Sequence, residues 1–260
     1  MTGADTLALP AIPSFRLDGK RALVTGASRG IGFAAAAALA AQGAEVVLCA
    51  RSGTALERAC DALTSAGHRA RPLVLDVTDL AAVENVLAAE PPFQVLVNCA
   101  GMARHGPFVE ARPADFDAVV NVNLRAAFFL AQNVSRRLIE AGETGSIINV
   151  SSQMGHVGGV DRSVYCATKH ALEGMTKAMA IELARHGIRV NTLCPTFVDT
   201  ELVRSTLADP ERRAWIMSRI CLGRLAQLGD LTGPLLLLAS DAGAMMTGSA
   251  LVVDGGWTAA

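Results

Sequence analysis

The chain alternates between short apolar runs and longer stretches rich in alanine and leucine. Seven runs have the length of buried strands, and the stretches that separate them have the length and composition of helices. The predicted strands span residues 22–26, 45–50, 71–77, 93–101, 145–152, 188–195 and 249–256. The predicted helices span residues 30–43, 53–66, 79–89, 113–141, 163–186 and 227–239.

The strand runs lack the polar alternation of a sheet with one solvated face. Such strands are typical of a parallel sheet that helices cover on both faces. Right-handed crossovers then predict an α/β fold: a single doubly wound, Rossmann-type domain with a seven-stranded parallel sheet. We expect a flexible N-terminal arm over residues 1–17 and the dinucleotide-binding and catalytic domain over 18–260. Within it, residues 196–225 follow the sixth strand, where such sheets bind ligands, and are interpreted as a substrate lid.

Composition limits the possible partners. Lys and Arg number 23 against 24 Asp and Glu, so the net charge is −1 and no basic field favours nucleic acid or an anionic membrane. The apolar run at 33–41 is far shorter than the roughly 20 residues of a spanning helix, and the start lacks a signal-peptide pattern. The six scattered cysteines suit reduced thiols and no bound metal. We therefore expect a cytoplasmic protein with a small-molecule substrate.

The segment ALVTGASRGIG combines a strand, a glycine turn and the start of a helix. Gly26 allows a sharp exit from the strand, and Gly30 and Gly32 allow the helix start to approach a pyrophosphate, which free N–H groups stabilise. The turn therefore predicts dinucleotide binding. The expected contacts are Gly26, Ser28, Arg29, Gly30, Ile31 and Gly32.

The end of the second strand distinguishes the two nicotinamide dinucleotides. NAD sites place an acid there for the ribose 2′-hydroxyl, whereas NADP sites place Arg near the 2′-phosphate. This chain has Ala50 and Arg51 at that point, and Arg29 in the glycine turn is a second cation. Because an Arg–phosphate contact is strong and geometrically selective, the sequence favours NADP(H) over NAD(H).

The only tyrosine, Tyr165, stands four residues before Lys169. On a helix these two side chains share one face. A free phenol exchanges protons poorly at neutral pH, but a neighbouring ammonium stabilises the phenolate and improves general acid–base catalysis. The pair therefore predicts a catalytic acid/base, with Lys169 also placed to donate to the nicotinamide ribose.

The motifs TGASRGIG, NCAG, NVNL, VSS and YCATK occur in this order. With them, the chain resembles the compact branch of the short-chain dehydrogenase/reductase family from about Lys20 to Trp257. The resemblance implies a catalytic tetrad of Asn123, Ser152, Tyr165 and Lys169. The further cofactor contacts that it implies are Asp76 and Val77 after the third strand, Asn98, Ala100 and Gly101 after the fourth, and Pro195, Val198 and Thr200 after the sixth.

Each remaining tetrad member has an expected role. The hydroxyl of Ser152 can hold the substrate oxygen while Tyr165 exchanges the proton. Ser151 competes for this role, but the thirteen-residue step from Ser152 to Tyr165 matches the family. Asn123 is expected to hold a water beside Lys169, through its side chain or its backbone, and so to give the proton a route to solvent.

The substrate is the least determined feature. Gln153, His156 and Thr196 are candidate substrate residues, and their polarity suits a sugar, a sugar acid or a polyol. Thr196 stands where the family usually has glycine, and Cys99 stands where it usually has a second asparagine. The leading hypothesis is an NADP(H)-dependent oxidoreductase that interconverts a secondary alcohol and a ketone.

Other functions stay open at this point. The alternatives are a 3-ketoacyl thioester reductase, for which Arg136 and Arg137 offer a small basic surface, and a non-catalytic dinucleotide-binding sensor. A sugar-nucleotide epimerase would need a substrate domain after Gly256. The helices at 113–141 and 163–186 carry apolar residues on more than one face, which predicts a homo-oligomer. The family resemblance implies a tetramer.

Overall fold

The computed structural model describes residues 9–259. Residues 1–8 of the predicted arm lie outside this range. Residues 9–16 form neither helix nor strand and are exposed, and Leu17 is the first side chain that enters the core. The start of the packed structure therefore agrees with the expected end of the arm, whose flexibility stays a prediction.

The centre of the molecule is a seven-stranded sheet in which every neighbouring pair of strands is parallel. The strand order is β3-β2-β1-β4-β5-β6-β7, so the chain reverses its direction of winding between β1 and β4. The strands are β1 (Arg21–Thr25), β2 (Glu45–Ala50), β3 (Ala70–Val74), β4 (Val95–Asn98), β5 (Gly145–Val150), β6 (Ile188–Pro195) and β7 (Ala250–Val253). The predicted Rossmann-type fold is confirmed.

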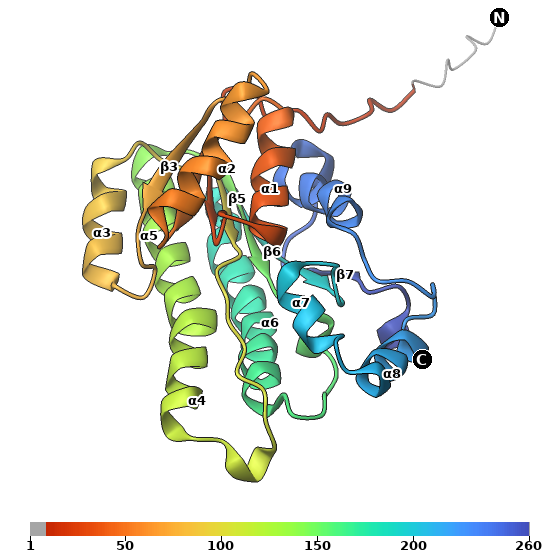
Figure 1. Cartoon of the computed structure of the whole chain (residues 1–260). Coiled ribbons are helices and arrows are strands. Elements are labelled where there is room, and N and C mark those ends of the chain that lie inside the picture. The colour runs from red at the N-terminus through yellow and green to blue at the C-terminus, as the bar shows by residue number, and fades with distance from the viewer. Residues whose placement is uncertain (1–8, 260) are drawn as a thin grey trace, which may run out of the picture.

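Helices cover both faces of this sheet (Figure 1). Side chains of α1 (Gly30–Ala41), α2 (Gly53–Ser65) and α9 (Leu228–Ala239) share one core with the strands. Side chains of α3 (Leu80–Ala89), α5 (Ala127–Ala141) and α6 (Ser163–Leu183) share the core on the other face. Along β1, Ala22 and Val24 enter the first core whereas Leu23 enters the second, because successive strand side chains point to opposite faces. This burial explains why the strands are apolar on both faces.

The helix predicted over 113–141 is interrupted. It begins as α4 (Pro113–Val120), continues as a π-helical segment over Asn121–Ala126, and ends as α5. Apolar periodicity does not reveal such a segment, because the chain continues in helical conformation on both sides. π-helical turns are frequent at functional sites, and this one contains the buried Asn123.

The predicted lid contains two short helices, α7 (Glu201–Thr206) and α8 (Pro210–Arg219). Ile216 and Ile220 are buried in a small cluster with Phe197 and Trp257, separate from the two cores that flank the sheet. Tyr165 packs against the same cluster. The segment is therefore folded over the carboxyl edge of the sheet, next to the predicted acid/base, and its role as a lid stays a prediction.

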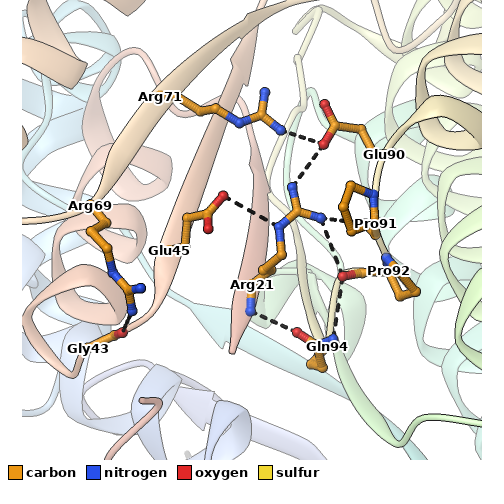
Figure 2. A network of polar contacts seen from close by, with 9 residues as sticks. All are labelled: Arg21, Gly43, Glu45, Arg69, Arg71, Glu90, Pro91, Pro92 and Gln94. Atoms are coloured by element: carbon orange, nitrogen blue, oxygen red, sulfur yellow. Dashed lines mark hydrogen bonds and ion pairs between the residues drawn. The ribbon is translucent and has the colours of Figure 1, made fainter. Parts of the chain in front are cut away.

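The amino edge of the sheet is held by a network of charged groups (Figure 2). The Arg21 guanidinium donates to Glu90 at 2.8 Å and lies 3.4 Å from Glu45, and Arg71 also donates to Glu90. The Arg21 backbone N–H donates to Gln94 at 2.7 Å. These contacts join β1, β2, β3 and the segment that precedes β4 at the edge away from the predicted site. Within residues 9–259, no helix combines the length and the apolarity that crossing a membrane requires.

Candidate active site

The glycine turn between β1 and α1 brings backbone close to backbone. Gly26 has φ +65°, and a Cβ there would lie 3.0 Å from the Cα of Ala100. A Cβ at Gly32 would collide with the Gly26 carbonyl oxygen. Gly30 has φ +57°, a conformation that suits glycine. The helix starts with Arg29 as N-cap and without a side-chain cap, so its first N–H groups are available to an anion. This cradle fits a dinucleotide pyrophosphate.

The other predicted residues of the turn are placed accordingly. Ser28 is half-buried in the turn itself. Ile31 packs against the core below the helix start, so its side chain supports the turn from inside. The Arg29 guanidinium is exposed and lies 3.2 Å from Glu201 of α7, which connects the turn to the lid.

Two charged residues mark the expected position of the adenosine. Asp76 accepts hydrogen bonds from the Thr78 backbone N–H at 2.9 Å and the Thr78 hydroxyl at 2.7 Å. The Thr78 backbone bond, opposed by burial, lowers the pKa of Asp76, and the nearby charge of Arg51 adds to the decrease. Arg51 is exposed at the end of β2, and Val77 is buried. The structure thus brings together Arg51 and the Asp76–Val77 pair, as the sequence predicts.

The NCAG loop is held by a residue that the sequence analysis did not select. The Thr25 hydroxyl accepts from the backbone N–H groups of Cys99 and Ala100, at 3.1 and 3.0 Å. The amide of Asn98 donates to Asn149 of β5 at 2.9 Å. These bonds fix the loop against the glycine turn. The only sequence signal for this contact was a polar residue, Thr25, at the end of an apolar strand.

The predicted acid/base pair shares one face of α6. The Lys169 ammonium lies 5.5 Å from the centroid of the Tyr165 ring. Lys169 is 6% exposed, and its Nζ donates to the carbonyl of Val150 at 2.8 Å. The next residue toward Tyr165, Thr168, donates its hydroxyl to the Tyr165 carbonyl at 2.8 Å. The buried ammonium is therefore held at the end of β5, on the same side of α6 as the Tyr165 ring.

Asn123 connects the π-helical segment to the loop after β4. Its Oδ1 accepts from the Met102 backbone N–H at 2.8 Å, and its Nδ2 donates to the Met102 carbonyl at 2.9 Å. Nδ2 also lies 3.2 Å from the Thr168 hydroxyl. Because the side-chain amide is engaged by these groups, the backbone carbonyl is the better candidate for the predicted water beside Lys169. This role stays a prediction.

Ser152 lies in a turn that follows β5 and packs against α6. Its hydroxyl accepts from the Met154 backbone N–H at 3.1 Å and donates to Oε1 of Gln153 at 3.2 Å. Gln153 is 1% exposed, and its side-chain oxygen holds the Ser152 hydroxyl through this hydrogen bond. Ser151 Oγ, Gln153 Nε2 and Thr196 Oγ1 are buried without a hydrogen-bond partner among the described residues. Two of these atoms belong to the candidate substrate residues Gln153 and Thr196, and on α5 Ser135 Oγ and Arg137 Nε are buried without a partner as well.

His156 contacts a cluster of buried polar side chains from α6 and β6. Its Nε2 lies 3.4 Å from Cys194 Sγ and 3.7 Å from a Glu173 carboxylate oxygen. Glu173 also accepts from the Thr192 hydroxyl at 2.8 Å. Burial raises the pKa of the Cys194 thiol to about 12, so the thiol is protonated and serves as a donor in this group. Nε2 of His156 is therefore directed at Cys194 and Glu173. The expected substrate role of His156 stays a prediction.

The segment after β6 is attached to its surroundings through its backbone. The Thr196 N–H donates to the carbonyl of Val253 at 3.2 Å, and Val198 forms a bridge with Ala226. Pro195 and Val198 are buried, and Thr200 is the N-cap of α7. Backbone hydrogen bonds therefore hold the predicted nicotinamide segment in place between β6 and α7.

The chain is similar to known proteins over nearly its whole length. The family model described as Enoyl-(Acyl carrier protein) reductase matches residues 26–258. D-erythrulose reductase of Gallus gallus is 42% identical over 248 residues, which cover 94% of this chain and 98% of the relative. The chain belongs to the short-chain dehydrogenase/reductase family. The predicted family and enzyme class, an oxidoreductase of alcohol and ketone groups, are confirmed.

Two further members of the family are similar over nearly their whole length. L-xylulose reductase of Bos taurus is 42% identical over 244 residues, with coverage of 94% and 98%. A crystal structure of a gluconate 5-dehydrogenase from Burkholderia cenocepacia J2315, in complex with NADP and tartrate, superposes with a TM-score of 0.91 at 37% identity. The alignment covers 96% of this chain and 99% of that one.

Proposed function

We propose that the protein is an NADP(H)-dependent oxidoreductase that interconverts a secondary alcohol and a ketone of a sugar, a sugar acid or a polyol. The observation that carries the proposal is the buried Lys169 ammonium held beside the only phenol of the chain. A binding protein would have no use for this arrangement at the carboxyl edge of the sheet. Ser152, on a turn packed against the same helix, completes the group.

The side chains divide the chemistry between them. Tyr165 exchanges a proton with the substrate oxygen while Ser152 holds that oxygen through its hydroxyl. Lys169 is placed to donate to the nicotinamide ribose, and Asn123 keeps the π-helical segment against Met102 and Thr168. The glycine turn and the segment after β6 hold the two ends of the dinucleotide, which when bound supplies or accepts the hydride.

The relatives support the choice of cofactor and substrate. The gluconate 5-dehydrogenase structure contains NADP, and the reductases of erythrulose and xylulose are named for polyhydroxylated carbonyl compounds. The prediction of an NADP(H)-linked oxidoreductase of such compounds is confirmed at this level. Arg51 at the end of β2, with no acid at that position, agrees with a cofactor that carries a 2′-phosphate.

The 3-ketoacyl thioester alternative loses its support in the structure. Arg136 lies 3.6 Å from Glu84, and Arg137 lies 3.4 Å from Glu140. Because each guanidinium has a carboxylate neighbour, the pair does not form the open basic surface that an acidic carrier protein would need. The sugar-type substrate is the better hypothesis.

We also propose that the enzyme acts as a cytoplasmic homotetramer. The six cysteines are all free, which suits a reducing compartment. Phe128 of α5 and Ile181 of α6 are 42% and 81% exposed, an apolar surface that a partner copy would cover. Leu130 and Met179 of the same two helices pack into the core instead, since they lie on the sheet side of their helices.

The test compares two neighbouring serines and the tyrosine. In NADPH assays with ketoses and keto-aldonic acids, Tyr165→Phe and Ser152→Ala are expected to lower kcat by about 100-fold or more. The matched control Ser151→Ala, whose Oγ has no protein partner among the described residues, is expected to keep most of the activity. NADPH affinity and Tm should be similar in all three variants. Near-wild-type turnover of Tyr165→Phe would contradict the proposed role.

A further inference from the structure

A cation without a counter-charge lies beside the predicted acid/base. Arg162 is the N-cap of α6, three residues before Tyr165. Its guanidinium lies over the ring of Phe197, 5.2 Å from the centroid. Phe197 belongs to the small cluster against which Tyr165 packs. Arg162 therefore lies beside the residues that surround Tyr165.

A neutral histidine holds this guanidinium in place. Nη1 of Arg162 lies 2.8 Å from Nε2 of His105, whose ring meets the Tyr165 ring edge-on at a centroid distance of 6.2 Å. Burial of the imidazole and the charges of Arg162 and Arg212 lower the pKa of His105 to about 4. At neutral pH the imidazole is uncharged, so Nε2 accepts from the guanidinium and the proton lies on Nδ1.

The charges of the surrounding residues do not neutralise Arg162. The neighbouring carboxylate, Asp161, is paired with Arg212 of α8 at 2.9 Å. Together with the neutral His105, these residues carry one net positive charge. Among the described residues, no carboxylate lies within ion-pair distance of Arg162, which is half-buried.

We infer that Arg162 is the residue that selects the substrate, by binding the carboxylate of a sugar acid while Tyr165 and Ser152 act on a secondary alcohol or ketone further along the same molecule. This inference rests on the proposed function and narrows it to one substrate class. A guanidinium offers a planar fork of N–H donors that matches a carboxylate. One net positive charge suits a monoanion, whereas a phosphate monoester carries about two negative charges at pH 7.

The charge of Arg162 also predicts that a neutral substrate binds less favourably than an anionic one. A neutral sugar or polyol would leave the half-buried guanidinium without a counter-charge, and burial already lowers its pKa. The contacts with Phe197 and His105 limit the rotamers of Arg162, so little conformational entropy is lost when a carboxylate binds. The site is therefore built for discrimination by charge.

The experiment compares a keto-aldonic acid with the ketose in which CH2OH replaces its carboxylate. With NADPH, we expect the wild type to prefer the acid in kcat/KM. Arg162→Gln should lower kcat/KM for the acid by about 10- to 100-fold and change the value for the ketose by less than about 3-fold. Arg162→Lys keeps the charge but loses the fork, so it should recover part of the preference.

The control is Arg185→Gln, which removes the same charge at an exposed position in the short turn that follows α6. It should leave the preference unchanged. Tm and NADPH affinity verify that each variant is folded. Equal acid-to-ketose ratios in the wild type and Arg162→Gln would overturn the inference, and so would a wild-type preference for the ketose or for a ketose phosphate.

A binding measurement separates failure of the inference from failure of the proposed function. Calorimetry of the NADPH complex with an aldonic acid, a monoanion whose alcohol cannot react with the reduced cofactor, requires no turnover. We expect the aldonic acid to bind the wild type about 10-fold or more tightly than Arg162→Gln. Absence of turnover with every ketose and keto acid would contradict the proposed function. Unchanged affinity for the aldonic acid in Arg162→Gln would overturn the carboxylate site.

Discussion

The two edges of the sheet differ in what their polar side chains contact. At the amino edge, Arg21 has carboxylate, amide and carbonyl partners, and Glu90 accepts from two guanidinium groups (Figure 2). At the carboxyl edge, the candidate substrate residues Gln153 and Thr196 each bury a polar atom that has no hydrogen-bond partner among the described residues, as do Ser151 and, on α5, Ser135 and Arg137. Paired charges stabilise a fold, whereas the unpaired atoms of the two candidate substrate residues are available to a ligand.

This difference assigns stability to one edge and binding to the other. Substitutions at the amino edge should change the free energy of unfolding and leave the kinetic constants unchanged. Substitutions at the carboxyl edge should change cofactor or substrate affinity, with little effect on stability. Each prediction below tests this separation with a pair of variants of the same chemical type.

The largest effect is expected at the end of β2. Arg51→Asp removes the cation proposed for the 2′-phosphate and supplies an acid for a 2′-hydroxyl. We expect the ratio of kcat/KM for NADPH to that for NADH to fall by about 100-fold, since charge-assisted bonds to phosphate are strong. Kinetics with both cofactors measure it, together with Tm.

The matched control for this variant is Arg58→Asp. Arg58 is exposed on α2, on the helix that follows Arg51. The same reversal of charge there should leave the cofactor ratio within about 3-fold of the wild type, because an exposed charge that makes no direct contact with the phosphate is weakened by solvent and salt. A ratio that changes equally in both variants would mean that overall charge, rather than Arg51, selects the cofactor.

The sequence was sufficient to predict the fold because the strands are apolar on both faces. Residues such as Leu23 and Val24 enter opposite cores, so no polar alternation obscured the parallel sheet. The glycine turn could also be located from the sequence, because its motif lies within a few residues of chain, whereas the catalytic roles of the tetrad stay predictions. The placement of Tyr165 and Lys169 on one helix face follows directly from their spacing.

The remaining features depend on contacts between distant segments. His105 and Arg162 are 57 residues apart, and only the folded chain places their side chains within 2.8 Å. The same is true of Thr25 and the NCAG loop, which meet because β1 and β4 are neighbours in the sheet. The π-helical segment around Asn123 escaped prediction for a local reason, since its apolar pattern is that of an ordinary helix.

An intermediate effect is expected at the amino edge. Glu90→Gln removes the carboxylate that compensates Arg21 and Arg71, so the free energy of unfolding should fall by about 1 to 2 kcal/mol at pH 7. In Glu84→Gln, the exposed control on α3, the loss should be below about 0.5 kcal/mol. Urea denaturation measures both, and kcat should be unchanged in each. A loss of activity at unchanged stability in Glu90→Gln would contradict the separation.

The pH dependence of this effect has a definite sign. Burial alone would raise the pKa of Glu90, but the bonds from Arg21 and Arg71 outweigh it and lower the pKa below 4.5. The ionised carboxylate therefore stabilises the fold above the unfolded value of 4.5, and this contribution is lost as the pH falls through the folded pKa. The stability difference between wild type and Glu90→Gln should be constant near neutrality and decrease below pH 4.5. A difference that grows on acidification would contradict this account.

The smallest effect is expected where the lid meets the glycine turn. Arg29 and Glu201 form an ion pair, but both side chains are more than three-quarters exposed, so the pair contributes little to stability. Glu201→Gln releases Arg29 for the cofactor and removes a negative charge near the phosphates, so NADPH should bind about 2-fold more tightly. Fluorescence titration measures this, with Glu211→Gln on α8 as the control. The gain should disappear in high salt, and weaker NADPH binding in Glu201→Gln would show that the ion pair orders the turn instead.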